Sequence, residues 1–322
     1  MYSTGSSEFG QLGNGATGEY FLSASKLGFS NCHRFEPRTH FVSSDETSFS
    51  TGTDDKKVDL KEDIRIGYIA CGKNHAIAVE APKEGGSANG NQQRIFSWGC
   101  GGYGCLGHGV QADEYYPRQL TFFRSRIFVK NNPIGGNCGA HGTIVLTEKG
   151  HGYFAGKQRL SDDSTMRPAL FDALASNGHI VTSASAGAQS IICCTKNGVT
   201  VTWGNGPYGD LGYGAESAKS SSNPKFVPAL DCCLVTRVAS GYGCTLFLIK
   251  NKDKEDKDAL KKLDIIEKDD VEEFEITSMA QFKEKLEKRE IRAMNLREGL
   301  KAKNSKRKQN EGNAKKEKKA KL

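Results

Sequence analysis

Residues 96–109 read Phe96-Ser97-Trp98-Gly99-Cys100-Gly101-Gly102-Tyr103-Gly104-Cys105-Leu106-Gly107-His108-Gly109. From Gly99 onward they form a pattern: a glycine, three free positions, an aromatic residue, then Gly-x-Leu-Gly-x-Gly. The pattern occurs three times, and its fixed positions are Gly5, Phe9, Gly10, Leu12, Gly13 and Gly15, then Gly99, Tyr103, Gly104, Leu106, Gly107 and Gly109, then Gly204, Tyr208, Gly209, Leu211, Gly212 and Gly214. Recurrence at a fixed internal spacing indicates repeated supersecondary units.

A second motif alternates with the first: a small residue, a glycine, two free positions and an apolar run. Its glycines are Gly72, Gly139, Gly187 and Gly241, which gives a period near 50 residues. Each unit also has a proline that we place at the start of a strand, where no ladder donor is needed; these are Pro37, Pro117, Pro168 and Pro224. About four short strands per period is the size of one propeller blade.

The sequence therefore predicts an all-β fold, a partial β-propeller, followed by a helical and disordered basic tail. We place the propeller in residues 1–250, with repeat units at about 1–79, 95–146, 152–192 and 200–249 and insert loops at 43–63 and 81–93. Residues 251–302 form a charged, partly helical extension, because Ser278 has capping-box spacing before an apolar periodicity. Residues 303–322 are expected to be disordered.

Charge separates the tail from the body. Residues 1–249 hold 22 Lys and Arg against 21 Asp and Glu, whereas the residues from Lys301 onward hold ten basic and two acidic ones. A bipartite nuclear-import signal is predicted there, which implies an importin as partner; its residues are Lys306, Arg307, Lys308, Lys315, Lys316, Lys318 and Lys319. The alternative is a disordered end that only keeps the chain soluble.

Two glycine runs imitate a cofactor site. Gly99-x-Gly101-x-x-Gly104 and Gly204-x-Gly206-x-x-Gly209 satisfy the dinucleotide-binding pattern, but the nearby glycines and Pro207 prevent the helix that this site requires. We expect blade turns and no cofactor. The ten cysteines contain no Cys-x2-Cys pair, so free thiols are expected rather than a metal site. No run of 18 apolar residues predicts a membrane span, and no catalytic residue can be named.

Residues 96–108, together with Ser164-Thr165-Met166-Arg167-Pro168 and Trp203 to Gly214, resemble the regulator-of-chromosome-condensation repeat family, specifically its second paralogue branch. The resemblance covers residues 1–262. The family's fold is a seven-bladed β-propeller, whereas four units are present here. We therefore expect a C-terminal fragment or a truncated gene model, and we expect residues 1–250 alone to aggregate, because an open propeller exposes its edges.

The resemblance implies a non-enzymatic regulator of small GTPases such as Rac, Arf or Ral, with guanine-nucleotide exchange as one mode of action. It also implies roles in mitosis at chromosomes, centromeres and microtubules, and a location in the nucleus, with the cytoplasm as a further site. The alternative is a chromatin- or RNA-associated structural protein whose basic tail supplies a salt-dependent affinity. An enzyme acting on a small-molecule substrate is third, because no convergent acid and base residues are visible.

Overall fold

The computed structural model describes residues 1–24, 26–44, 57–59, 64–82, 92–159, 161–214, 219–231, 233–261 and 263. All of them belong to the first of two compact units, Met1–Leu263. The second unit, Asp264–Leu322, lies outside the described residues. The predicted helix at Ser278 and the predicted import signal fall in that part of the chain.

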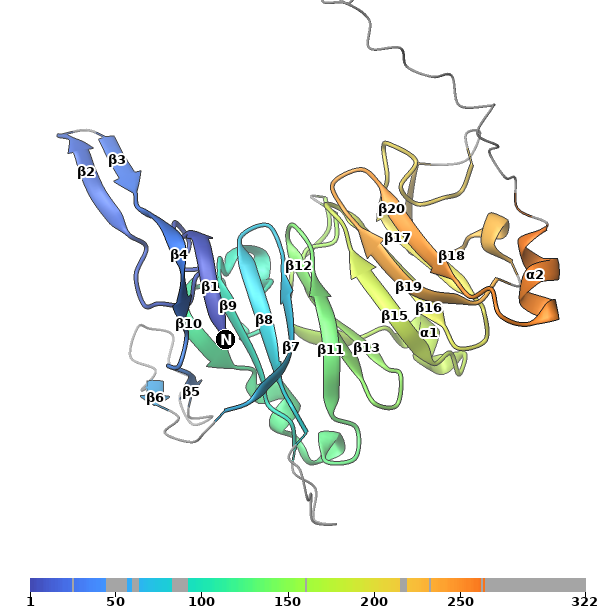
Figure 1. The fold of residues 1–322 in the computed structure, drawn as a ribbon, viewed down its shortest axis with the longest axis horizontal. Helices are drawn as coiled ribbons and strands as arrows, with labels where there is room; N and C mark the ends of the chain where they lie inside the picture. Colours follow the sequence, from blue (N-terminus) through green and yellow to red (C-terminus); the bar gives the residue numbers. More distant parts are fainter. Residues whose placement is uncertain are drawn as a thin grey trace, which may run out of the picture. The chain divides into compact units, whose positions relative to one another are not determined.

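Three groups of four antiparallel strands follow one another along the chain (Figure 1). Within each group the strands pair in chain order, which confirms the all-β expectation. The groups are β7 (Ile66–Cys71), β8 (His75–Glu80), β9 (Ile95–Gly99) and β10 (Glu114–Gln119); β11 (Pro133–Cys138), β12 (Gly142–Thr147), β13 (Gly152–Gly156) and β14 (Thr165–Leu170); β15 (Val181–Ala186), β16 (Ser190–Thr195), β17 (Thr200–Asn205) and β18 (Ser220–Phe226). The first group continues from β10 into β5 (Val42–Ser44) and β6 (Lys57–Asp59).

A two-stranded sheet stands at each end of this series. One consists of β1 (Tyr2–Ser6) and β4 (Asn31–Pro37), and the other of β19 (Val235–Ser240) and β20 (Thr245–Ile249). A hairpin of β2 (Glu19–Ser23) and β3 (Lys26–Phe29) is inserted between β1 and β4. The described strands form separate sheets that do not close into a ring, as expected for a partial propeller.

The glycine-rich stretch forms consecutive tight turns that include the single-turn 3-10 helix η1 (Gly102–Gly104). The amide of Gly104 donates to the Gly101 carbonyl at 3.0 Å, and the amide of Gly107 donates to the Gly104 carbonyl at 2.9 Å. The amide of Gly109 then donates to the carbonyl of Met166 at 2.9 Å, in the following sheet. The stretch therefore turns the chain and also joins neighbouring sheets.

The prolines lie differently from the prediction. Pro117, Pro168 and Pro224 lie inside β10, β14 and β18, and Pro37 ends β4 instead of opening a strand. The strands β10, β14 and β18 are the fourth strands of their groups, and β14 and β18 are sheet edges. An edge strand has one row of amides without a ladder partner, so proline is tolerated there.

The hydrophobic core consists of layers between consecutive sheets. Phe123 packs edge-on against Tyr153 with ring centroids 5.6 Å apart, and Phe171 packs edge-on against Trp203 at 5.1 Å. Short helical segments connect one sheet to the next: η2 (Thr121–Arg124), η3 (Arg126–Phe128), α1 (Asp172–Ser176) and η4 (Pro228–Leu230). After β20 follows α2 (Lys254–Leu260), whose N-terminus has a capping box between Asp253 and Asp256.

Candidate functional site

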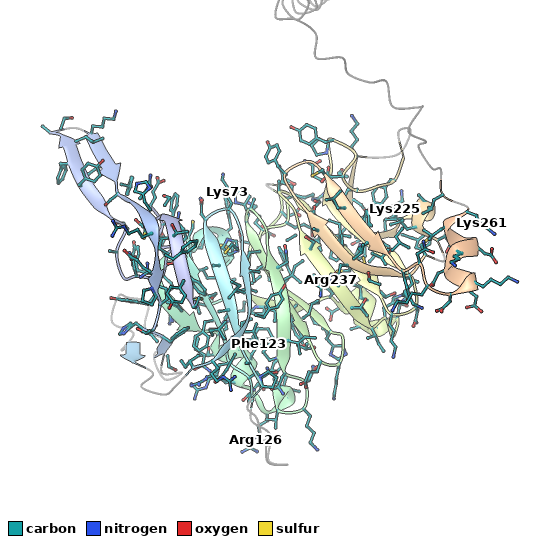
Figure 2. The ribbon with its side chains drawn as sticks, viewed as in Figure 1. Lys73, Phe123, Arg126, Lys225, Arg237 and Lys261 are labelled. Atoms are coloured by element: carbon teal, nitrogen blue, oxygen red, sulfur yellow. The ribbon has the colours of Figure 1, made fainter. Side chains whose placement is uncertain are left out.

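One end of the sheets gathers two sets of connections. The turns from first to second strand and the glycine-rich loops from third to fourth strand both emerge there, because strand direction alternates within each sheet. Lys73, on the β7–β8 turn, and Arg126, on η3, mark opposite ends of the sheets (Figure 2). We call the surface at the Lys73 end of the sheets the turn face. It is formed by Lys73, Tyr103, His141, Lys157, Tyr208 and Tyr242.

Three side chains from two sheets meet on the turn face. The Tyr103 ring contacts the His141 ring edge-on, with centroids 5.1 Å apart, and the Lys157 ammonium lies 5.1 Å from the centre of the Tyr103 ring. Burial lowers the pKa of His141, and the positive charges of Lys73 and Lys157 lower it further. The imidazole is therefore held in its neutral form near neutral pH. The cluster combines an aromatic surface with two cations.

Tyr103 has an unusual backbone conformation. Its φ is +60°, and among the described residues it is the one non-glycine with a positive φ. This conformation is costly for a residue with a Cβ, and such outliers concentrate at functional sites. It places the aromatic ring at the tip of the loop, 37% exposed.

A second aromatic pair lies on the last two repeats. The Tyr208 and Tyr242 rings have centroids 5.9 Å apart and are 65% and 78% exposed. A hydrogen bond with Tyr242 raises the pKa of Tyr208, so this phenol remains protonated. The pair offers apolar surface and hydroxyl groups to a partner.

The small-Gly turns line a hollow of about 270 Å³. Consecutive turns touch through their backbones: the amide of Lys73 donates to the Gly139 carbonyl at 3.1 Å, and the amide of Ala140 donates to the Gly187 carbonyl at 3.2 Å. A Cβ added at Gly72 would lie 2.4 Å from the Gly139 carbonyl oxygen. The glycine of this motif is therefore required by close approach of neighbouring turns.

The repeat residues predicted from the sequence lie in the loops of the turn face. Eight glycines have a positive φ: Gly99, Gly104, Gly107, Gly109, Gly204, Gly209, Gly212 and Gly214. Leu106 and Leu211 are buried, whereas Tyr103 and Tyr208 are exposed. The predicted import residues Lys306, Arg307, Lys308, Lys315, Lys316, Lys318 and Lys319 lie outside the described residues.

Sequence reasoning did not select His141, Lys157 or Tyr242 as surface-forming residues. His141 precedes β12 and Lys157 follows β13, and the antiparallel register, which pairs Gly142 with Gly156, brings both to the same end of the pair, beside Tyr103. The sequence does contain one indication of such surface residues. Lys73, His141 and Tyr242 each follow the glycine of the small-Gly motif by one or two residues.

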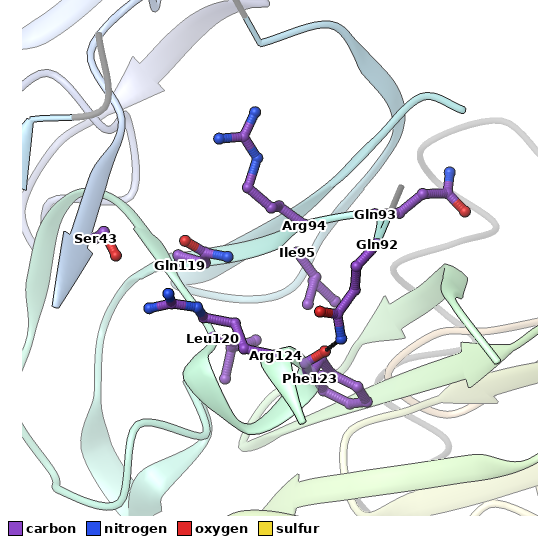
Figure 3. Close-up of a pocket in the computed structure, with 9 residues that line it drawn as sticks. All are labelled: Ser43, Gln92, Gln93, Arg94, Ile95, Gln119, Leu120, Phe123 and Arg124. Atoms are coloured by element: carbon purple, nitrogen blue, oxygen red, sulfur yellow. Dashed lines mark hydrogen bonds between the residues drawn. The ribbon is translucent and has the colours of Figure 1, made fainter. Parts of the chain in front are cut away.

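A second pocket of about 300 Å³ lies at the opposite end of the first sheet (Figure 3). Its polar wall includes Arg94, which makes a two-point ion pair with Glu80, and Gln92, whose amide donates to the Phe123 carbonyl. Two of its lining residues, Ser43 and Gln92, stand in the sequence next to or near segments that lie outside the described part of the chain. We therefore place the candidate site on the turn face.

The described residues contain no group of three His, Cys, Asp or Glu side chains that could hold a metal ion. No disulfide joins the cysteines of the described ranges. None of the described helices has the length and apolar composition needed to cross a membrane. The turn face is a surface of aromatic and basic groups.

Comparisons with known proteins agree with the repeat analysis. Residues 92–146 and 197–248 match the family model described as Regulator of chromosome condensation (RCC1) repeat. The chain is 33% identical over 264 residues to the Protein RCC2 homolog of Xenopus laevis. The aligned region covers 82% of this chain and 47% of that protein. It is 31% identical over 270 residues to Protein RCC2 of Homo sapiens, spanning 82% and 46%.

The chain thus spans about half the length of these relatives. Among solved structures, human WBSCR16 has a similar fold, with a TM-score of 0.52 and 16% sequence identity over 77% of this chain and 57% of that chain.

Proposed function

Because the chain belongs to the regulator of chromosome condensation (RCC1) repeat family, in its RCC2 branch, we propose that it is a non-enzymatic interaction protein that regulates a small GTPase. The predicted fold, a partial propeller of this repeat type, is confirmed. The observation that carries the proposal is the turn face, where loops of three different sheets present Tyr103, Tyr208 and Tyr242 at the same end of the sheets.

The composition of the turn face suits a protein partner. Tyrosine is enriched in the parts of interfaces that contribute most binding energy, because it combines a large apolar ring with a hydroxyl group. Lys73 and Lys157 add positive charge, which favours an acidic surface and accelerates association with it. We propose that the aromatic pairs contact the GTPase and that the lysines select its acidic face.

Nucleotide exchange would need no covalent chemistry. A surface that binds the nucleotide-free GTPase more tightly than the nucleotide-loaded form weakens the binding of the nucleotide by the same factor. This weakening promotes nucleotide release. We propose GTPases of the Rac, Arf or Ral kind as partners, and a role in mitosis at chromosomes, centromeres and microtubules.

The test is release of a fluorescent nucleotide from Rac, Arf and Ral proteins, together with a direct binding measurement. The full chain should bind at least one of them. The triple variant Tyr103→Ala, Tyr208→Ala, Tyr242→Ala should weaken binding at least tenfold, because each removed ring lies on the turn face. Ile127→Ala is the control: Ile127 is 72% exposed on η3, at the opposite end of the sheets from the turn face, and its loss should leave binding unchanged.

The outcomes separate binding from exchange. Binding without faster nucleotide release would support an interaction protein and exclude exchange. No binding to any of the three GTPase kinds would overturn the proposed partners, and equal binding by the triple variant would exclude the turn face.

The basic tail supports a second proposal, nuclear import by an importin. Its ten basic residues against two acidic ones from Lys301 onward offer point charges to acidic pockets. A fluorescent fusion that lacks residues 303–322 should leave the nucleus, whereas the full chain should accumulate there. Nuclear accumulation that persists after the deletion would contradict the signal.

The same tail also favours the alternative function, association with chromatin or RNA. If the tail carries that affinity, binding to DNA or RNA should weaken steeply with salt concentration and should disappear with residues 301–322.

A further inference from the structure

The end of the series formed by β19 and β20 has an uncovered apolar face. Leu246 and Leu248 are 71% and 61% exposed. The pairing of Thr245 with Ser240 matches that of Ile191 with Ala186, which makes β20 a second strand like β8, β12 and β16. The equivalent residues in those strands are at most 9% exposed: Ile77, Val79, Ile144, Leu146, Ile192 and Cys194.

The edge of β20 is also unpaired. In each complete sheet the second strand pairs with the first strand on one side and with the third on the other. Among the described residues, β20 pairs with β19 alone. An unpaired strand edge with an apolar face is a template for strand addition.

The other end presents the complementary half. β1 has the geometry of a third strand: Ser3 Oγ donates to the Leu12 carbonyl at 2.8 Å, as Ser97 Oγ does to that of Leu106 at 2.8 Å. Gly5, at the end of β1, has φ +116°, close to the +103° of Gly99 at the end of β9. Like a third strand, β1 pairs with a fourth, β4, and in the described structure its other edge has no strand.

An apolar residue stands beside that free edge. Ile69, on β7, is 56% exposed. Its equivalents by strand pairing are Gly136 on β11 and Ala184 on β15. A Cβ at Gly136 would lie 3.0 Å from Ile77 Cδ1, so this position faces the second strand of the preceding sheet. At Ile69 the preceding sheet is the β1–β4 pair, and a second strand is the element that would cover it.

We infer that β19–β20 of one copy of this chain docks beside β1 of a second copy and completes a four-stranded sheet. The second copy is the favoured occupant because the chain carries both halves, each with the register of the complete sheets. By analogy with the pairing of Ile77 with Ser97, Leu246 lies opposite Ser3 of the other copy, and Leu248 lies two residues further along.

Docking in this register buries Leu246 and Leu248 against Ile69 of the other copy. The contact joins two different surfaces of the protein. Repeated contacts of this kind produce a closed ring if the rotation from one copy to the next returns to the first copy, and an open filament if it does not. Two copies that join at both ends contain eight four-stranded sheets, which is within the range of known propellers.

The first test is the molar mass of the full chain in solution by light scattering. We expect assemblies of two or more copies of the 35.0 kDa chain. The variant Leu246→Glu, Leu248→Glu should be monomeric and still folded by circular dichroism, because both side chains are exposed in the single copy. Ile127→Glu is the matched control, since Ile127 is 72% exposed on η3 and its substitution should leave the mass unchanged.

The second test fixes the register. Chains with Ser3→Cys and chains with Leu246→Cys, mixed under mild oxidation, should form a cross-linked pair that reducing agent separates. Ser3→Cys mixed with Thr245→Cys should not, because adjacent residues of a strand point to opposite faces. A monomeric full chain, an assembly that survives the double glutamate substitution, or equal cross-linking by both mixtures would each overturn the inference.

Discussion

At the scale of single residues, His75 illustrates how burial fixes a charge state. Its side chain is 2% exposed, and its Nε2 lies 3.0 Å from Thr143 Oγ1 of the next sheet. Burial lowers the pKa of His75 to about 4, partly opposed by a hydrogen bond with the backbone of Gly142. The folded protein therefore keeps this imidazole neutral as a bridge between β8 and β12.

This burial predicts a pH dependence of stability. In the unfolded chain the pKa of His75 is near 6.5. Between about pH 6.5 and pH 4, therefore, His75 binds a proton in the unfolded state but not in the folded state. The free energy of unfolding should be highest above pH 6.5 and should fall by up to ~3 kcal/mol as the pH approaches 4. Urea unfolding of the full chain at pH 7, 5.5 and 4.5 measures it.

The control is His75→Gln, which retains a polar side chain that does not titrate. Its pH dependence in this window should be clearly smaller. His141 has a lowered pKa as well and contributes in the same direction to both proteins. An identical pH dependence in both would show that His75 is not responsible.

At the scale of elements, one motif position separates local from long-range constraints. Gly104 and Gly209 follow the aromatic residue of the motif and have φ +72° and +86°. A Cβ at Gly104 would lie 2.8 Å from the Met166 Cα on β14, whereas a Cβ at Gly209 would have nothing within 4 Å. Both turns require a left-handed residue, and only the first also contacts the next sheet so closely.

We therefore expect unequal effects of the same substitution. Gly209→Ala should cost about 1 kcal/mol of unfolding free energy, from backbone strain alone. Gly104→Ala should cost ~2–4 kcal/mol, because the backbone of Met166 must also move. The urea midpoints of the two variants and the parent chain give the comparison. Equal losses of unfolding free energy in the two variants would show that β14 moves away from the loop at no measurable cost.

At the scale of the whole molecule, the sheets stack through residues far apart in sequence. The amide of Ser240 donates to Ser185 Oγ at 2.9 Å, and the hydroxyl of Tyr68 donates to the Gly136 carbonyl at 2.6 Å. Each complete sheet is covered by its neighbours, whereas Ile69, Leu246 and Leu248 at the two ends are exposed. These exposed ends give a structural basis for the expected aggregation of residues 1–250. If the two ends pair as inferred above, the result is an assembly of defined size instead of an aggregate.

The repeat architecture and the family could be predicted from the sequence because both rest on local requirements. A positive φ strongly favours glycine, and the leucine of each glycine-rich loop is buried. Both constraints act within a few residues, so they recur as a readable motif.

The grouping of strands into sheets and the makeup of the turn face were decided only by tertiary structure. Residues 95–146 supply β9 and β10 to one sheet and β11 and β12 to the next, because register is set by contacts between distant strands. That same register brings His141 and Lys157 to Tyr103 and leaves β1 and β20 as two halves of a sheet. No local pattern encodes these contacts, since they depend on how sheets stack.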